Sequence, residues 1–321
     1  MSLDQINTNT YQHGVLSEVV ITIPEPQFEQ LPLLVCFDGG LALPVIAPYD
    51  RIENAINRFN RVLCALLLDG IEVEAIDSRH VVSGSLYQST HVWPVNDGQS
   101  LDVHLHAAMR TRVASSFDSI LLHKPKNILV SELLQAYQSG NTILDAIPNL
   151  SPTFLLRGHT ELKYKNWSDA LASLWIAVEQ LTDHLWEHTF LKDPKRQLST
   201  IPKRFKSLRE DSRTWSLVVR QEILWQMGVL PSQTYELLFP SRQARNNLIH
   251  EGAPPDSETV RGLYEAVLQL IEIIGRTGSL GIRKIEVDKE IPSITNQNIQ
   301  SYKDGRSLWE KFRDATPKDE R

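Results

Sequence analysis

The stretch that decides the fold of the carboxyl-terminal half of this 321-residue chain is Trp167-Ser168-Asp169-Ala170-Leu171-Ala172-Ser173-Leu174-Trp175-Ile176-Ala177-Val178-Glu179-Gln180-Leu181. Its large apolar residues recur at intervals of three and four, the spacing of one face of an α-helix. The same stripe continues to Leu185 and Trp186. Ser168 is a residue type that commonly caps a helix at its amino end. The pattern predicts a long helix with one face in a hydrophobic core.

Further amphipathic segments accompany this helix. A strong apolar stripe runs from Ser257 to about Ile274, and Asp256 or Ser257 can cap its first turn. We expect helices over residues 153 to 165, 168 to 191, 214 to 227, 242 to 251 and 257 to 274. Together they predict an all-α bundle over residues 151 to 278.

The predicted helix at 242 to 251 carries the motif Arg245-Asn246-Asn247-Leu248-Ile249-His250-Glu251-Gly252. Ser241, which follows Pro240, is a suitable N-cap residue. Gly252 is followed by Ala253-Pro254-Pro255 and is therefore a strong stop signal. We expect a short helix that begins after Ser241 and has His250 in its last turn.

Arg245 and His250 are the two groups that a metal-free ribonuclease needs. A histidine can move the proton of the RNA 2′-hydroxyl or of the leaving 5′-oxygen, because the unperturbed pKa of imidazole lies near neutrality. An arginine stays charged and can hold the phosphate while negative charge builds on its oxygens. On an ideal helix Arg245 and His250 lie about 140° apart, whereas Asn246 and His250 share a face. Convergence on one phosphate therefore requires a bend, the long reach of arginine or a second protomer.

The pattern Arg245, Asn246 and His250 resembles the signature of the HEPN superfamily, an Arg followed by Asn and, a few residues later, by His. The helix from Trp167 to Leu181 is similar to that of Apea-like HEPN domains, where an acidic residue follows small and aromatic apolar residues. The resemblance covers residues from about 150 to 275. It implies a metal-independent endoribonuclease that leaves a 2′,3′-cyclic phosphate and a 5′-hydroxyl, with Arg245, His250 and Asn246 as its catalytic residues. It also implies a homodimer with a composite site across a two-fold interface, and a role as a toxin or antiviral defence effector.

Glu179 is the candidate supporting residue. It borders the apolar stripe of its helix, and a carboxylate at the margin of a core needs a partner. Arg245 is the candidate partner, and the pair would orient the guanidinium. The alternative is purely structural: Arg245 pairs with Glu179, His250 caps helix carbonyls, and the motif has no chemistry.

Basic residues are concentrated between Lys192 and Arg213, although the chain as a whole has a net charge of −6 and is no general polyanion binder. If this segment lies near the motif, it could hold an RNA backbone. The candidate RNA-binding residues are Lys203, Arg204, Lys206 and Arg242. The alternative is that these basic residues lie on a solvated loop and helix face and bind no RNA.

The first 150 residues predict an α+β domain of unknown role, a possible sensor or regulator. Segments rich in β-branched residues predict strands at 15 to 23, 31 to 37, 71 to 76 and 81 to 95. A long amphipathic helix is expected over 50 to 68 and a short one near 131 to 139. The expected fold class is an α+β amino-terminal domain followed by an all-α HEPN helical bundle, with a polar tail from 279 to 321 that contains one amphipathic segment at 307 to 312.

Composition supports a globular chain, with 41% hydrophobic and 22% charged residues. No apolar run approaches the roughly 18 residues of a membrane span, and Asp4 interrupts any basic signal-peptide head, so we expect a cytoplasmic protein. Cys36 and Cys64 lie among apolar residues and predict buried thiols.

No metal or cofactor is expected. His104 and His106 alternate onto one face of a predicted strand near His91, but no carboxylate or cysteine cluster has ligand spacing around them. Ser83-Gly84-Ser85 predicts a turn and lacks the frame of a hydrolase elbow or phosphate loop.

The sequence therefore predicts an endoribonuclease that acts on RNA, with an antitoxin or regulatory protein as a further partner and no membrane association. The alternative is a non-catalytic HEPN scaffold that binds RNA, a nucleotide or a protein. A third hypothesis, a toxin controlled by a nucleotidyltransferase, needs a partner chain, because no nucleotidyltransferase motif occurs here.

Overall fold

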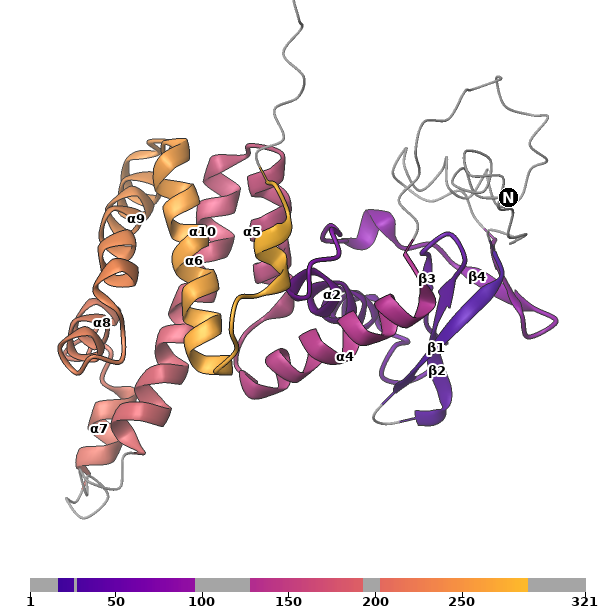
Figure 1. Cartoon of the computed structure of the whole chain (residues 1–321), viewed down its shortest axis with the longest axis horizontal. Helices are drawn as coiled ribbons and strands as arrows, with labels where there is room; N and C mark the ends of the chain where they lie inside the picture. The colour runs from indigo at the N-terminus through magenta and orange to yellow at the C-terminus, as the bar shows by residue number, and fades with distance from the viewer. Residues whose placement is uncertain (1–16, 26–27, 96–127, 193–202, 288–321) are drawn as a thin grey trace, which may run out of the picture. The chain divides into compact units, whose positions relative to one another are not determined.

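The computed structural model describes residues 17–25, 28–95, 128–192 and 203–287 (Figure 1). Its β-structure lies near the amino end of the chain. Strands β1 (Val19–Glu25) and β2 (Phe28–Cys36) pair antiparallel, and β2 also pairs with β3 (Leu41–Ala42), giving the order β1-β2-β3. Strands β4 (Gly84–Tyr87) and β5 (His91–Pro94) form a separate antiparallel pair.

The three-stranded sheet packs on helix α2 (Ile52–Leu68). Alternate residues of β1 and β2 point to the same face, and on that face Ile23 and Leu33 are fully buried opposite each other. They share a hydrophobic cluster with Phe59 and Val62 of α2. The predicted mixture of helix and strand in this part of the chain is confirmed.

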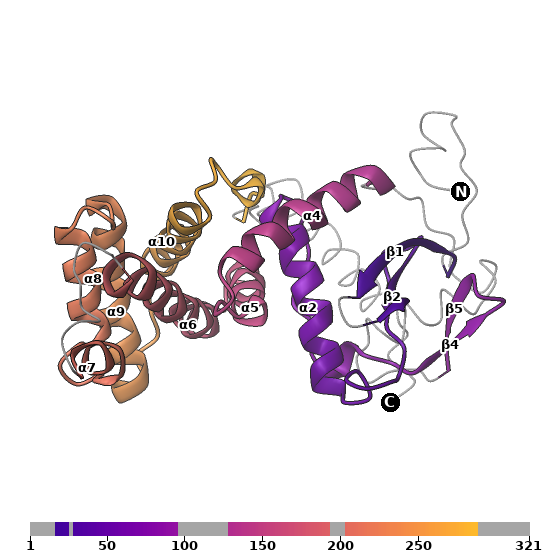
Figure 2. The same ribbon diagram turned by 90° about the horizontal axis from the view of Figure 1, so that it is seen from below.

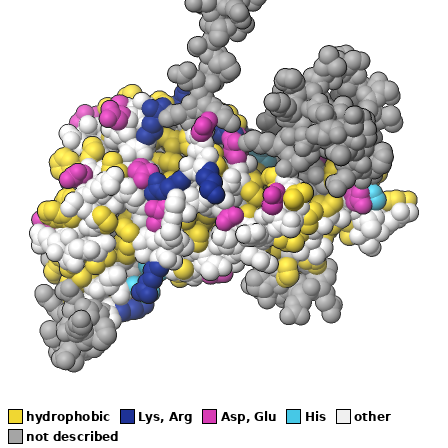
Figure 3. All heavy atoms as spheres, in the orientation of Figure 1, with side chains coloured by type: hydrophobic (Ala, Val, Ile, Leu, Met, Phe, Trp, Pro, Cys, Tyr) yellow, Lys and Arg dark blue, Asp and Glu magenta, His cyan; other side chains and the backbone are white. Residues whose placement is uncertain are grey.

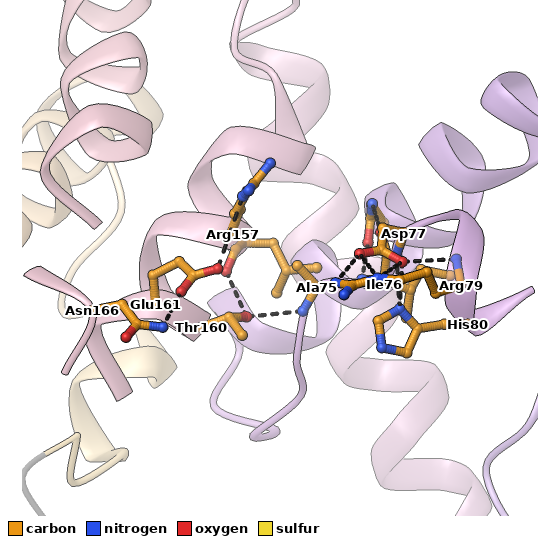
Figure 4. Close-up of polar contacts among 11 residues, drawn as sticks. Ala75, Ile76, Asp77, Arg79, His80, Arg157, Thr160, Glu161 and Asn166 are labelled. Carbon is orange, nitrogen blue, oxygen red and sulfur yellow. Dashed lines mark hydrogen bonds and ion pairs between the residues drawn. The ribbon is translucent and has the colours of Figure 1, made fainter. Parts of the chain in front are cut away.

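Two of the predicted strands need correction. Residues 71 to 76 form no strand, and at the end of this segment side chains rather than a neighbouring strand bind the backbone. The buried Asn60 makes two 2.9 Å hydrogen bonds to the backbone of Ile76, and Thr160 Oγ1 accepts from Ala75 N at 2.9 Å (Figure 4). The segment from 81 to 95 is the hairpin of β4 and β5, because Gln88 and Ser89 adopt positive φ and reverse the chain.

Helix α4 (Val130–Ala146) extends beyond the predicted range and packs against α2, which also contacts α5 (Pro152–Lys163) (Figure 2). The close approach of α2 and α4 depends on Gly140. A Cβ atom at this position would lie 1.9 Å from the carbonyl oxygen of Ala65. Glycine is therefore required where the two helices meet.

The remaining helices form the part that was predicted to be all-α. They are α6 (Trp167–Leu185), α7 (Arg204–Glu210), α8 (Leu217–Gln226), α9 (Ser232–Glu251) and α10 (Ser257–Gly275). A π-helical turn, η3 (Trp186–Leu191), continues α6. The apolar stripes of α6 and α10 are buried as predicted, with the following side chains fully inaccessible: Leu171, Leu174, Val178, Leu181, Val260, Leu263, Val267 and Ile271.

The start of α9 was predicted wrongly. The helix begins at Ser232, and Pro240 lies inside it. Ser241 is therefore not an N-cap: it is buried in the helix, and its Oγ donates a 2.8 Å hydrogen bond to the carbonyl of Leu237. An interior proline removes one backbone hydrogen bond and crowds the carbonyl four residues earlier, so the packing of α9 must offset this cost at Pro240.

Contacts divide the chain into one compact unit that ends at Ile285 and a second that begins at Glu286. The domain boundary near residue 150 stays a prediction. Cys36 and Cys64 are both buried, as expected. Among the described residues, none of the helices combines the length and the apolar character needed to cross a bilayer. The amphipathic segment at 307 to 312 lies outside the described residues.

Candidate active site

Helix α9 carries the predicted motif at the outer edge of the bundle, where it packs against α10 and α6 (Figure 1). It ends at Gly252, as predicted. Gly252 has a φ of 69°, and its N–H donates a 3.1 Å hydrogen bond to the carbonyl of Leu248. This left-handed stop places His250 in the last turn of the helix, with its side chain exposed.

The three motif residues lie on two sides of α9. Arg245 is half-buried, whereas Asn246 and His250 are exposed. Arg245 Nη1 donates a 3.3 Å hydrogen bond to Asn246 Oδ1. Since Asn246 lies about 40° from His250 around the helix axis and Arg245 about 140°, this contact turns the guanidinium toward the face that bears the imidazole.

Glu179 does not pair with Arg245, so the predicted supporting contact is wrong. Glu179 Oε1 instead accepts a 2.8 Å hydrogen bond from Trp175 Nε1, one turn earlier on α6. Within the described ranges no ion pair involves either Glu179 or Arg245.

The helix packing explains why the pair is not formed. Ser241 Oγ lies 3.5 Å from the carbonyl of Thr259, and the Arg261 guanidinium lies 5.5 Å from the Trp167 ring. These contacts place the second half of α9 level with the amino end of α6. Glu179 is twelve residues further along α6, a rise of about 18 Å. The carboxylate and the guanidinium therefore lie at different heights in the bundle.

The basic segment is only partly described. Lys203 precedes α7 and is exposed, and only the backbone of Arg204 is described. Lys206 lies 3.7 Å from Glu210, and two further cations, Lys192 and Arg209, contact Glu187. Glu210 within the segment and Glu187 of η3 thus offset part of its positive charge.

Arg242, the fourth candidate RNA-binding residue, lies on α9 itself. Its guanidinium is 5.2 Å from the centre of the Phe239 ring. Phe239 and Ile249 are 56% and 57% exposed, although both are large apolar residues. Sequence reasoning missed this aromatic surface, although Phe239, Asn246 and His250 recur at the spacing of one helical face.

Metal ligands are not grouped in the part of the chain that the structure describes: no three His, Cys, Asp or Glu side chains there could hold one ion. His91 stands at the start of β5, and His104 and His106 lie outside the described residues. Gly84 begins β4, so Ser83-Gly84-Ser85 leads into a strand.

No family model, curated protein or solved structure matches the chain. The residues of α9 thus receive no role from a relative.

Proposed function

We propose that the protein is a HEPN-type, metal-independent endoribonuclease in which Arg245 and His250 are the catalytic residues. The supporting observation is that neither residue has the role given to it by the purely structural alternative, in which Arg245 pairs with Glu179 and His250 caps helix carbonyls. In the described part of the chain, Arg245 has no carboxylate partner, and the His250 ring makes no hydrogen bond or ion pair. A permanent cation and an accessible imidazole are thus both free to meet a ligand.

The chemistry is a transesterification within RNA. The 2′-oxygen bonds to the adjacent phosphorus, the bond from phosphorus to the 5′-oxygen breaks, and the products are a 2′,3′-cyclic phosphate and a 5′-hydroxyl. His250 accepts the 2′-hydroxyl proton or supplies a proton to the leaving oxygen. Arg245 holds the non-bridging phosphate oxygens as they gain charge, and Asn246 orients Arg245.

The proposal includes a homodimer, because Arg245 and His250 project about 140° apart on one helix and the hydrogen bond of Arg245 to Asn246 spans only part of that angle. A two-fold axis beside the end of α9 would bring Arg245 of one protomer toward His250 of its partner. The enzyme would act in the cytoplasm as a toxin or defence effector, under the control of an antitoxin or regulatory partner. The α+β part of the chain would sense the trigger.

The test is cleavage of labelled total RNA and tRNA by purified protein in EDTA. Arg245→Ala and His250→Ala should each abolish cleavage, and EDTA should leave the wild type active. Matched controls are Arg157→Ala, an exposed arginine on α5, and His91→Ala on β5, which should cleave like the wild type. Equal residual cleavage by all proteins would indicate a contaminant and contradict the proposal.

Subunit mixing tests the composite site. Co-expressed Arg245→Ala and His250→Ala chains form mixed dimers that keep one intact Arg245 and one intact His250, on different protomers. Regained cleavage in the mixture supports a site shared between subunits. Two inactive parents and an inactive mixed dimer of the correct mass would contradict it.

The second candidate is a non-catalytic scaffold that binds RNA, a nucleotide or a protein. The exposed apolar side chains of Phe239 and Ile249 beside the motif favour this candidate. It is supported if the purified dimer binds RNA but releases no cyclic phosphate.

A further inference from the structure

We propose that Phe239 and Arg242 of α9 form a stacking site for an unpaired base, so that the substrate is single-stranded RNA lying along α9. This inference rests on the proposed RNA cleavage, which requires the strand to pass His250.

Position on the helix is the first argument. At 100° per residue, Phe239 lies within about 20° of both Asn246 and His250 around the axis. Phe239 is the most exposed aromatic side chain of the described part of α9, while the buried side of the helix faces α10. One exposed face therefore carries an aromatic ring, an amide and an imidazole in line.

Charge is the second argument. The Arg242 guanidinium lies 5.2 Å from the Phe239 ring centre, a cation–π geometry. From Phe239 to His250 the sequence contains Arg242 and Arg245 but no aspartate or glutamate. A strand of RNA has flat bases that can stack on the ring and phosphates that can bind the guanidinium groups. An apolar protein surface has neither.

The aromatic surface continues beyond Phe239. Tyr235, one turn earlier, stacks on Trp225 of α8 with the ring centres 5.0 Å apart and the planes 9° apart. Trp225 is 38% exposed, and its Nε1 donates to Ser232 Oγ. Hydrophobic side chains are visible on the surface along α8 and α9 in Figure 3. The rings of Tyr235 and Trp225 thus extend the aromatic surface from Phe239 in the direction away from His250.

The spacing fits a strand of several nucleotides. Eleven residues separate Phe239 from His250, a rise of about 16 Å. A base that stacks on Phe239 would therefore be a few nucleotides from the scissile phosphate. Stacking on a ring face requires a base outside a duplex and depends little on its identity, so the site selects for single strands rather than for a sequence.

The test measures binding without cleavage, in a His250→Ala background. The probe is a fluorescent single strand of twelve uridines, and anisotropy gives its affinity. Phe239→Leu, which keeps an apolar side chain but removes the ring, should weaken binding by on the order of tenfold. Phe239→Trp should retain binding. The control Tyr87→Leu removes another exposed aromatic ring, on β4, and should change nothing.

The outcomes separate this inference from the proposed function. Unchanged affinity in Phe239→Leu, or equal affinity for the single strand and for the same strand in a duplex, overturns the stacking site. A variant with unchanged RNA affinity but an altered dimer mass would assign the face to a second copy of the chain and also overturn it. If Phe239→Leu loses binding while the wild type never cleaves, the stacking site stands and the nuclease proposal fails.

Discussion

The guanidinium of Arg245 donates a hydrogen bond to Oδ1 of Asn246 at 3.3 Å, although the two residues are neighbours in sequence and project about 100° apart around α9. The arginine therefore leans along the surface toward the face of His250. Asn246 acts as a positioning residue in the proposed site, since its amide can hold the guanidinium without cancelling its charge.

Two substitutions of Asn246 should distinguish the orientation of the Arg245 guanidinium from its charge. Asn246→Ala should lower the turnover number for RNA cleavage by on the order of tenfold, because the guanidinium loses its orienting contact. Asn246→Asp should lower it further, because a carboxylate at this position pairs with Arg245 and offsets its charge. Single-turnover cleavage assays measure both. The control Gln243→Ala, exposed on the same helix, should match the wild type; equal activity of Asn246→Asp and wild type would contradict the positioning role.

The end of α9 depends on the left-handed conformation of Gly252. Gly252→Ala should lower the free energy of unfolding by about 1 kcal/mol, because an L side chain is disfavoured at a φ of 69° even though the space beside this glycine is open. Urea denaturation followed by circular dichroism measures the change. Gly278→Ala is the matched control: its surroundings are also open, and its φ lies outside the left-handed region. Equal effects at the two glycines would show that backbone conformation is not the cause.

Gly140, where α2 meets α4, should be one of the glycine positions most sensitive to substitution. Gly140→Ala should destabilise the protein by roughly 3 kcal/mol or more, because the new methyl group meets the carbonyl oxygen of Ala65 and the helices must move apart. Gly262→Ala is the control, since a Cβ atom there meets only the end of the Leu237 side chain, at 3.2 Å. A thermal melt of Gly140→Ala that coincides with the wild type would contradict the packing of α2 on α4.

The apolar stripes of α6 and α10 could be predicted from the sequence because helix periodicity is a local property and both stripes are long. The start of α9 could not, because Pro240 and Ser241 have the local pattern of a helix start, whereas the structure places both inside α9, with Ser241 packed against Thr259 of α10. Residues 71 to 76 have the composition of a strand, but the partner that binds their backbone, Asn60, is a side chain whose position no periodicity indicates.

The motif itself was readable from residue types and a stop signal, and its exposure follows from the polar face of α9. The partner of Glu179 was not readable. Trp175 is a local neighbour at helical spacing, whereas pairing with Arg245 depends on the relative height of two helices, which the sequence does not encode in any short pattern. The exposed Phe239 was missed for a related reason: periodicity shows that residues share a face, but it does not say which face packs.

A buried histidine predicts acid sensitivity of the fold. His159 on α5 is 1% exposed, its Nδ1 lies 2.8 Å from the hydroxyl of Tyr264 on α10, and its Nε2 has no partner among the described residues. Burial, helped by the positive charge of Lys163, lowers the pKa of His159 to about 4, although Glu72 and Glu74 oppose the shift.

The folded state therefore binds fewer protons than the unfolded state between pH 4 and about 6.5, so stability is full above pH 6.5 and falls as the pH falls toward 4. The loss attributable to His159 is on the order of 3 kcal/mol over this window, with a slope of at most about 1.4 kcal/mol per pH unit.

Urea denaturation at pH 7, 6, 5 and 4 measures this loss of stability. His159→Gln, which keeps a hydrogen-bonding group for Tyr264 but does not titrate, should flatten the pH dependence. A His159→Gln protein that loses stability on acidification as steeply as the wild type would show that other groups cause the acid sensitivity.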